Sequence, residues 1–305
     1  MVRLGVCLGL LCVSLSALPL RAAADGSRSG KIDEARERMS ESTNDDDDDD
    51  DGGDGDSSDD DDSSLLDDDD DEDEPGVLEQ AAGQLVLYTL GFPFLAPQLI
   101  LGDREPGRQY DLQPYPYAGG SEGPFRFLRL NEEGEPYERT PVALSLRAMA
   151  SYERHAANLD GRRLRLTLRT NMRIGLDAGI TRYDEVLGPG DHDSLWHYHG
   201  LATVAFAVSP RAQFTFGLGA RNIRFSGDEN YTHFALHYAA EFFPVRPLHA
   251  WMLGEVSFWT DTWATELEAG LGVMLHRFEV FGGYRQFRVV GVDFAGPEVG
   301  VIAWF

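Results

Sequence analysis

Residues 123–305 are dominated by segments in which apolar and polar residues alternate one by one. Within residues 162–183, the even positions from 164 to 180 are apolar at eight of nine places, whereas the odd positions from 163 to 181 offer only Arg, Thr, Asn, Gly and Asp. A period of two puts the apolar side chains on one face of a β-strand, but on a helix it would spread them around the whole cylinder. The pattern therefore predicts strands and leaves little room for helices.

Turn-forming residues interrupt the alternation about every dozen residues and divide the region into strands. Splitting residues 162–183 at Asn171 would give one more strand, but the alternation continues through Asn171 and argues against a turn there. We predict ten strands, with eight or twelve as alternatives. They are expected at 142–154, 162–183, 195–208, 212–225, 231–243, 248–260, 263–275, 278–288 and 297–305, with a weaker one at 124–131.

The composition of the two strand faces favours a membrane over water, although a soluble antiparallel sheet would alternate too. Lipid can cover the apolar face without a partner sheet, and a sheet in hydrocarbon must close because unpaired backbone groups are costly there. The fold class expected is therefore all-β: a closed antiparallel up-and-down transmembrane β-barrel. The polar face would line its lumen, and the residues predicted to do so are Arg163, Arg165, Arg169, Arg173, Asp177, His197, His199, His237, Glu241, Glu255, Glu266, Glu268 and Arg285.

The connections between the predicted strands fall into two sets, which orients the barrel. One set is tight, at 158–161, 209–212, 244–247 and 276–278, and the other is longer or more polar, at 184–194, 226–230, 260–262 and 289–296. Short periplasmic turns and longer external loops are typical of bacterial barrels. Aromatic residues near the strand ends predict interfacial girdles. These residues are Tyr183, Trp196, Tyr198, Tyr231, Trp259 and Trp263 at the outer rim, and Phe242, Phe243, Phe278, Trp304 and Phe305 at the inner rim.

The chain ends in EVGVIAWF, where Val299, Val301, Ala303 and Phe305 alternate with their neighbours. This ending resembles the terminal assembly signal of Gram-negative outer-membrane β-barrel proteins, and it identifies no subfamily. Ala303 departs from the pattern, because an aromatic residue is frequent at that spacing. The penultimate Trp304 is expected to face the lumen. The resemblance implies that the barrel-insertion machinery binds the last strand, and that the protein lies in the outer membrane in contact with the lipid bilayer and lipopolysaccharide.

Residues 1–24 are typical of a cleaved secretory signal peptide. Arg3 precedes an apolar run from Leu4 to Leu20, and small residues follow it before Asp25. Both cysteines of the chain, Cys7 and Cys12, lie within this segment. The mature protein is therefore expected to contain neither disulfides nor thiol chemistry.

Residues 25–81 form an acidic low-complexity segment. Residues 45–74 alone hold 21 Asp and Glu with no Lys or Arg, and account for most of the formal net charge of −26. Like charges and few apolar groups predict disorder. We expect a solvated tether in the periplasm that binds divalent cations weakly through its carboxylates. The chain carries no basic patch, which excludes nucleic acid as a partner.

Residues 82–122 combine an apolar segment with a Pro/Gly-rich linker. Residues 83–103 are apolar enough for a membrane span, but Pro93 and Pro97 obstruct a straight helix. We expect a short broken helix or hairpin that packs on the barrel, in the lumen mouth or at the membrane face. The domains predicted are thus 1–24, 25–81, 82–122 and a barrel at 123–305.

The motif DHDSLWHYH, residues 191–199, offers the most suggestive chemistry. His197 and His199 would lie about 7 Å apart on one strand face, close enough to share a metal ion. No other residue fixes such a geometry, so polar lumen filling is favoured. We assign no catalytic, metal or cofactor site and expect no cofactor.

The function predicted is that of an outer-membrane barrel with a structural or small-solute pore role. Barrels of about eight strands are filled by their own side chains, so ten strands allow a narrow pore at best. The alternative is an outer-membrane enzyme that uses rim His and Asp residues. Omptin proteases resemble the chain in strand number, with Asp191, His192 and Asp193 as the comparable residues, and lipid acyltransferases resemble it through the segment before the barrel.

Overall fold

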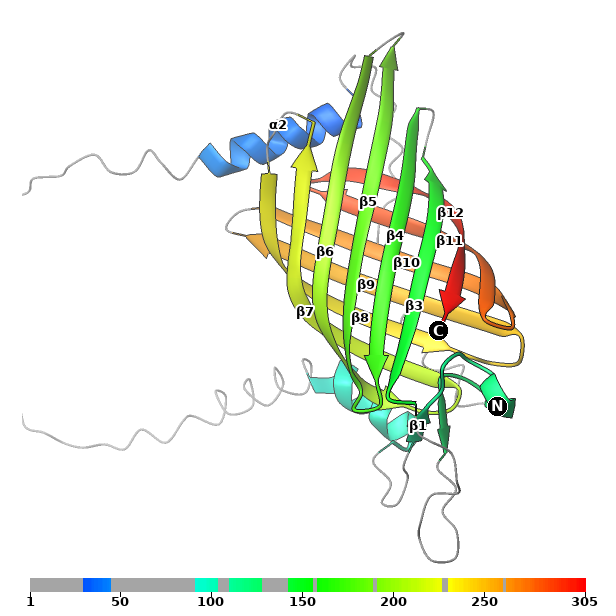
Figure 1. The fold of residues 1–305 in the computed structure, drawn as a ribbon. Coiled ribbons are helices and arrows are strands. Elements are labelled where there is room, and N and C mark those ends of the chain that lie inside the picture. Colours follow the sequence, from blue (N-terminus) through cyan, green and yellow to red (C-terminus); the bar gives the residue numbers. More distant parts are fainter. Residues whose placement is uncertain are drawn as a thin grey trace, which may run out of the picture.

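Ten strands of the computed structural model form one closed barrel, so the predicted all-β fold class and strand number are confirmed. The structure describes residues 30–44, 91–103, 110–127, 142–155, 158–188, 191–226, 230–259 and 262–305. Neighbours in the barrel are antiparallel and follow the chain order, and β12 pairs with β3 to close it (Figure 1). The strands are β3 (Leu144–Arg154), β4 (Leu159–Thr170), β5 (Ile174–Gly188), β6 (Asp191–Val208), β7 (Ala212–Phe225), β8 (Asn230–Phe242), β9 (Leu248–Trp259), β10 (Thr262–Leu275), β11 (Phe278–Val289) and β12 (Val292–Trp304).

Two strand assignments made from the sequence are wrong, although their errors cancel in the count. The predicted strand 162–183 is a hairpin of β4 and β5, joined by residues 171–173. The described part of the predicted strand 124–131, residues 124–127, contributes no barrel strand. Instead, β2 (Phe125–Phe127) pairs with β1 (Tyr110–Leu112) in a separate two-stranded sheet.

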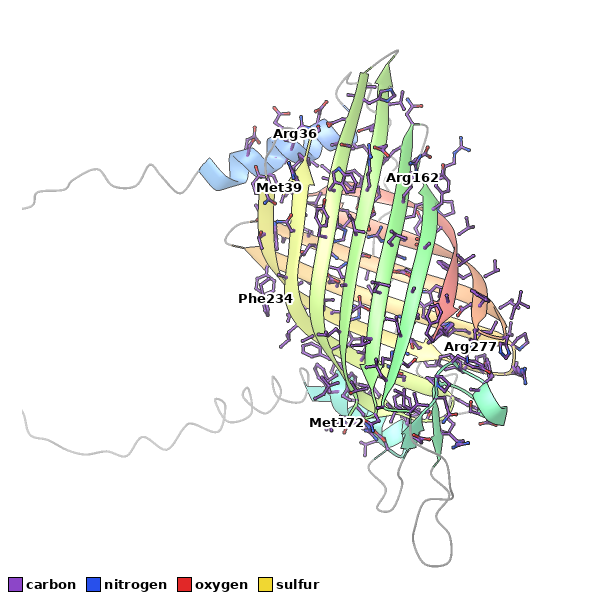
Figure 2. The ribbon with its side chains drawn as sticks, in the orientation of Figure 1. Arg36, Met39, Arg162, Met172, Phe234 and Arg277 are labelled. Atoms are coloured by element: carbon purple, nitrogen blue, oxygen red, sulfur yellow. The ribbon has the colours of Figure 1, made fainter. Side chains whose placement is uncertain are left out.

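The missed turn is invisible to the alternation because it contains three residues. Paired residues of a hairpin face the same side, and Leu168 pairs with Leu176, so even positions remain on the outer face after the turn. Arg173 takes a left-handed conformation with φ 66°, and the Thr170 hydroxyl donates to the Ile174 carbonyl. Figure 2 shows Met172 at the end of the barrel opposite α2. A turn with an odd number of residues therefore leaves a period-two pattern unbroken, and the pattern cannot reveal it.

The connections define two ends of the barrel, here called the α2 end and the Phe305 end. Turns 171–173, 209–211, 243–247 and 276–277 lie at the Phe305 end, and the other five connections lie at the α2 end. The connection predicted at 158–161 was assigned to the tight set, but it lies at the α2 end with the longer connections. The assignment was wrong because the turn at 171–173 was missed, which shifted the alternation of the two ends by one connection. The predicted loops 184–194 and 289–296 are mostly strand, so these hairpins extend almost to their tips.

The helix α2 (Lys31–Asn44) lies across the α2 end of the barrel (Figure 1). Ile32, Ala35 and Met39 recur on one helix face and are fully buried. The predicted disorder of 25–81 is therefore wrong for this stretch, because the neighbouring acidic tract dominated the composition and concealed a short amphipathic repeat. The rest of that segment and the signal peptide lie outside the described residues, so the domain boundaries stay a prediction.

Residues 91–101 are helical and pack on the outer face of the barrel near the Phe305 end. The Phe94 ring lies 5.2 Å from that of Phe206 and 5.3 Å from that of Phe216, and the Tyr238 hydroxyl donates to the Pro93 carbonyl. Residues 83–103 were expected in the lumen mouth or at the membrane face, and the described part lies on the outer, membrane-facing side of the barrel. None of the helices in the described ranges has the length and apolar character needed to span a membrane.

Candidate functional site: the charged lumen and its two closures

The interior of the barrel holds a network of buried ion pairs centred on Glu266 of β10. Its carboxylate accepts hydrogen bonds from Arg285 at 2.8 Å and from Arg221 at 2.6 Å, and lies 3.5 Å from Arg163. All three guanidinium groups are buried. Removing one partner from such a cluster would leave an uncompensated buried charge, so its members depend on one another.

Further ion pairs of the same arginines connect strands across the lumen. Arg163 of β4 donates to Glu268 at 2.7 Å and to Glu298 at 2.6 Å, on β10 and β12. Arg285 of β11 donates to Glu153 of β3 at 2.6 Å and to the Tyr183 hydroxyl of β5 at 2.7 Å. Together with Arg221 of β7, side chains from seven strands therefore meet in the middle of the barrel and occupy its cross-section.

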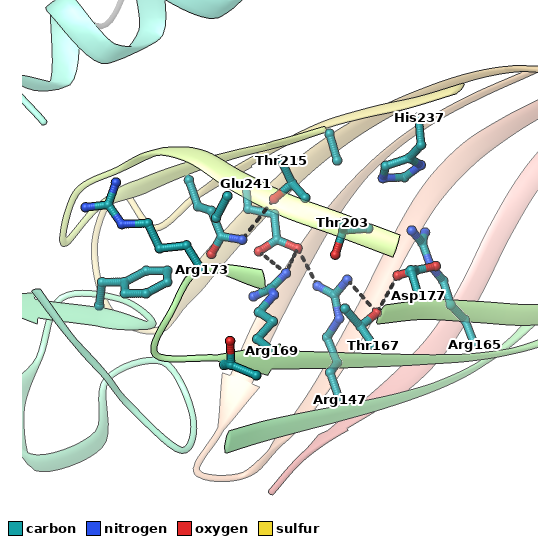
Figure 3. A pocket seen from close by; sticks show the side chains of 15 residues that line it. Arg147, Arg165, Thr167, Arg169, Arg173, Asp177, Thr203, Thr215, His237 and Glu241 are labelled. Atoms are coloured by element: carbon teal, nitrogen blue, oxygen red, sulfur yellow. Dashed lines mark hydrogen bonds and ion pairs between the residues drawn. The ribbon is translucent and has the colours of Figure 1, made fainter. Parts of the chain in front are cut away.

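A second group of ion pairs lies closer to the Phe305 end, around a small cavity (Figure 3). Glu241 accepts hydrogen bonds from Arg147 at 2.5 Å and Arg169 at 2.6 Å. Nearby, Asp177 accepts from Arg165 at 2.8 Å and from the Thr167 hydroxyl at 2.7 Å. The cavity has a volume of about 30 Å³, which holds no more than a few water molecules.

Most residues predicted to line the lumen are brought together in this network. Arg169 is half-buried beside Glu241, whereas Arg173 lies in the 171–173 turn at the edge of the cavity and forms an ion pair with Asp103 at 2.7 Å. The others are buried inside the barrel: Arg163, Arg165, Asp177, His197, His199, His237, Glu241, Glu255, Glu266, Glu268 and Arg285.

The histidines of the DHDSLWHYH motif contact different partners. The ring of His197 stacks on Phe287 with centroids 5.1 Å apart, and His199 lies 3.0 Å from the Asp177 carboxylate. Their own ring centroids are 5.8 Å apart. Within the described ranges, no three ligating side chains are grouped so that they could hold a metal ion.

The α2 end is closed by an apolar cluster and a few polar contacts. The buried face of α2 packs against residues that include Leu195 and Phe225. The Glu185 carboxylate accepts hydrogen bonds from the backbone N–H groups of Lys31 at 3.0 Å and Ile32 at 2.9 Å, which caps the helix N-terminus. A Cβ on Gly30 would lie 2.6 Å from this carboxylate, so glycine permits the close approach.

Arg36 provides the main ion pair between α2 and the barrel. It donates to Asp193 at 2.9 Å and to the Ser226 hydroxyl at 2.9 Å. Asp33, on the same side of the helix, has its pKa raised, first by burial and then by the neighbouring Asp193. The contact surface of α2 is therefore apolar in the centre and charged at its edge.

The Phe305 end is closed by aromatic side chains. Tyr117, from the segment before the barrel, packs with Phe243, Trp251 and Trp304, and its hydroxyl donates to the Leu248 carbonyl. Tyr117 takes a left-handed conformation with φ 66°. Burial, followed by the nearby Glu279 carboxylate, raises the pKa of Tyr117 to about 12.

The outer face of the barrel is apolar around its whole circumference. Leu164, Leu271 and Val299 are 59%, 71% and 58% exposed. A continuous apolar surface of this kind requires lipid or another apolar partner. The fold is that of an outer-membrane β-barrel. Other exposed apolar residues of this band are Leu166, Leu176, Val204, Leu218, Phe234, Val256, Val273, Val280 and Val301.

No protein-family model and no curated protein matches the chain of this outer-membrane barrel. Similar solved structures include the KdgM porin, with 10% identity over 53% of this chain and 99% of that chain, at a TM-score of 0.32. Ail of Yersinia pestis in a nanodisc shares 12% identity over 54% of this chain and 100% of that chain, at 0.31. An anion-selective porin from Comamonas acidovorans shares 12% identity over 52% of this chain, at 0.27, and the match spans only 59% of that porin. The closed ladder and the apolar exterior, rather than these distant likenesses, define the fold.

The sequence-based prediction missed several interior residues of the barrel. The rule that every second residue of a strand faces inward could have identified them. Glu153 and Glu298 are buried in the central network, on the same faces of β3 and β12 as other inward residues. Tyr183 and Phe243 were predicted in the girdles but are buried in the interior clusters. Trp304 was expected at the inner rim with its side chain toward the lumen, and it is buried there. Whether an aromatic residue faces the lumen depends on its place in the inward–outward alternation of the strand, and not on how near it lies to the end of the strand.

Proposed function

We propose that the protein is a structural outer-membrane β-barrel whose lumen is filled by its own side chains and conducts no solute. The observation that carries this proposal is the central network, in which Glu266 joins Arg163, Arg221 and Arg285 across the barrel. Apolar clusters close both ends beyond it. A small-solute pore would need these buried ion pairs to separate without water or counter-ions to replace them.

We place the Phe305 end in the periplasm and the α2 end at the cell surface. A row of outward residues near the α2 end supports this orientation, because Arg162 pairs with Arg182, Arg182 with Trp196, and Trp196 with Arg224 on four adjacent strands. The Arg182 guanidinium lies 5.0 Å from the centre of the Trp196 ring. Arg182 also pairs with Asp184 at 2.7 Å, and a row of three arginines attracts further anions. Lipopolysaccharide phosphates on the outer leaflet would supply such anions.

The other proposed partners, the barrel-insertion machinery and divalent cations, follow from placing the Phe305 end in the periplasm. Val299, Val301 and Phe305 of the terminal segment are all more than half exposed on the outer face, where the barrel-insertion machinery could bind them during assembly. The acidic segment would remain in the periplasm, with weak binding of divalent cations. No nucleic acid is expected to bind.

The enzyme alternative gains no support among the described residues. Asp193 of the candidate rim motif is occupied by its ion pair with Arg36, and His192 is exposed on the β5–β6 hairpin. The side chain of Asp191 lies outside the described set. We therefore propose no reaction.

Planar-bilayer recording tests the closed lumen. The full chain and a variant lacking residues 30–44 are compared with a trimeric porin reconstituted in the same membrane. We expect no conductance steps from either form, because the ion pairs around Glu266 remain when α2 is removed. Regular steps from the full chain would refute the proposal, and steps from the deletion alone would make α2 the gate of a pore.

A further inference from the structure

The helix α2 and residues 91–127 are anchored at opposite ends of the barrel (Figure 1). At one end, Arg36 contacts Asp193 and the first backbone N–H groups of α2 contact Glu185. At the other end, Tyr117 donates to the Leu248 carbonyl, beside the aromatic closure. The 46 residues between Asn44 and Gly91 must therefore connect the two ends of a closed barrel.

A chain can join the two ends of a bilayer-spanning barrel only through the lumen or through the lipid. The lumen is occupied by the buried ion pairs around Glu266. The lipid route is also blocked, because residues 45–74 contain 21 acidic residues and no Lys or Arg, and carboxylates are costly in hydrocarbon. Fully extended, 46 residues reach about 150 Å. That length can pass around the rim of a detergent belt but not around a continuous membrane.

We propose that docking of α2 and insertion of the barrel into a continuous bilayer exclude one another within a single chain. The helix closes its end of the barrel while the protein is outside the bilayer, and it leaves when the barrel is inserted. This inference depends on the proposed membrane location. In the inserted state α2 stays with the acidic segment at the Phe305 end, on the other side of the membrane from its vacated mouth.

The vacated mouth keeps the chemistry that held α2. It presents apolar residues that include Leu195 and Phe225, with the carboxylates of Glu185 and Asp193 at its edge. It fits an amphipathic helix with an arginine beside its apolar face and a free N-terminal turn, as in α2 itself. In the inserted protein such a helix can reach the mouth only from the cell surface.

Cysteine cross-linking in two environments tests this exclusion. The full chain carries Cys7→Ser and Cys12→Ser, together with Arg36→Cys and Ser226→Cys, which replace residues in contact at 2.9 Å. A membrane-permeant bifunctional thiol reagent about as long as the arginine side chain is applied to intact outer membranes and to the same protein in detergent. The cross-linked fraction is measured by gel mobility and peptide mass.

Two further cysteine pairs separate undocking of α2 from poor access of the reagent in membranes and from the loss of Arg36. Asp193→Cys with Ser226→Cys joins two neighbouring barrel residues, and it should react equally in both environments. Lys31→Cys with Asp293→Cys probes a second contact between α2 and the barrel, in which the Lys31 ammonium donates to the Asp293 backbone carbonyl, and this pair keeps Arg36 intact. Retention of the protein in membranes after an alkaline carbonate wash reports insertion independently.

We expect both α2 pairs to cross-link in detergent and to fall at least ten-fold in intact membranes, while the barrel pair is unchanged. Equal cross-linking of α2 in washed membranes would overturn the exclusion and leave the membrane location standing. Absence of α2 cross-links in both environments would also overturn it, because the helix would then not dock. Loss of the protein in the carbonate wash would overturn both the exclusion and the proposed function.

Discussion

The two ends of the barrel are closed by structures of different kinds. At the Phe305 end, Trp251 and Trp304 belong to the strands themselves and enclose Tyr117. At the α2 end, the cover is a separate helix held by an apolar face, two backbone hydrogen bonds to Glu185 and the ion pair of Arg36. A closure built from strand residues shares the stability of the barrel, whereas a docked helix can leave without unfolding it.

The largest expected difference comes from removing one buried side chain at each end. Trp304 is 1% exposed, and Trp304→Ala should lower the free energy of unfolding of the barrel by about 3–5 kcal/mol. Met39→Ala removes a fully buried side chain of α2 and should leave barrel unfolding unchanged, while increasing the hydrogen exchange of α2. The free energy of unfolding of the barrel is measured by urea titration, with the folded fraction read from the different gel mobilities of unheated and heated samples. Equal losses in the two variants would contradict a separable α2.

A smaller effect is expected from the polar contacts at the start of α2. Glu185→Gln weakens the acceptor of two backbone N–H groups, and Gly30→Ala forces that carboxylate away. Each should weaken docking by about 1–2 kcal/mol. Glu34→Gln is the matched control, since its pair with Arg38 is exposed and lies within the helix. Hydrogen exchange over residues 31–41 in detergent provides the measurement, and an effect of Glu34→Gln as large as that of Glu185→Gln would contradict the assignment.

Alkaline pH should loosen the Phe305 end in a defined window. The pKa of Tyr117 is raised to about 12, so its neutral form is favoured in the closed state. The resulting stability is fully present below pH 10 and is lost as the pH rises to about 12, because an opened Tyr117 ionises first. Protease sensitivity of residues 110–127 should increase across this window, and Tyr117→Phe should remove that part of the dependence. A transition unaffected by Tyr117→Phe would exclude this hydroxyl.

The smallest effect is expected at an exposed ion pair of the Phe305 end. Arg211 and Glu122 form two hydrogen bonds of 2.6 and 2.7 Å, but both side chains are more than half exposed. Arg211→Gln should change the free energy of unfolding by about 0–1 kcal/mol. The same urea titration gives the value. A loss comparable to that of Trp304→Ala would mean that this end is held by charge rather than by aromatic packing.

The barrel could be predicted because its strands alternate strictly, and that same regularity limited the prediction. Alternation located the inward face, including the charged residues of β4 and β10, but it passed unchanged through the three-residue turn at 171–173. Ion-pair partners such as Arg163 and Glu298 could not be matched, because they depend on barrel closure and shear rather than on position along the chain. The helix α2 was hidden because local amphipathicity over 14 residues was averaged with an acidic tract.

The central claim is that lipid covers the outer face of the barrel. It is tested most directly by measuring whether every second residue of β4 is exposed to lipid. Single nitroxide labels at Leu166 and at Thr167, adjacent residues that are 53% and 6% exposed, are compared in reconstituted membranes. The same comparison is made between Val256 and Ser257 of β9. We predict that Leu166 and Val256 collide with oxygen dissolved in the lipid, and that Thr167 and Ser257 are shielded from it. Collision of the Leu166 and Val256 labels with a water-soluble nickel chelate instead would contradict an outer face solvated by acyl chains.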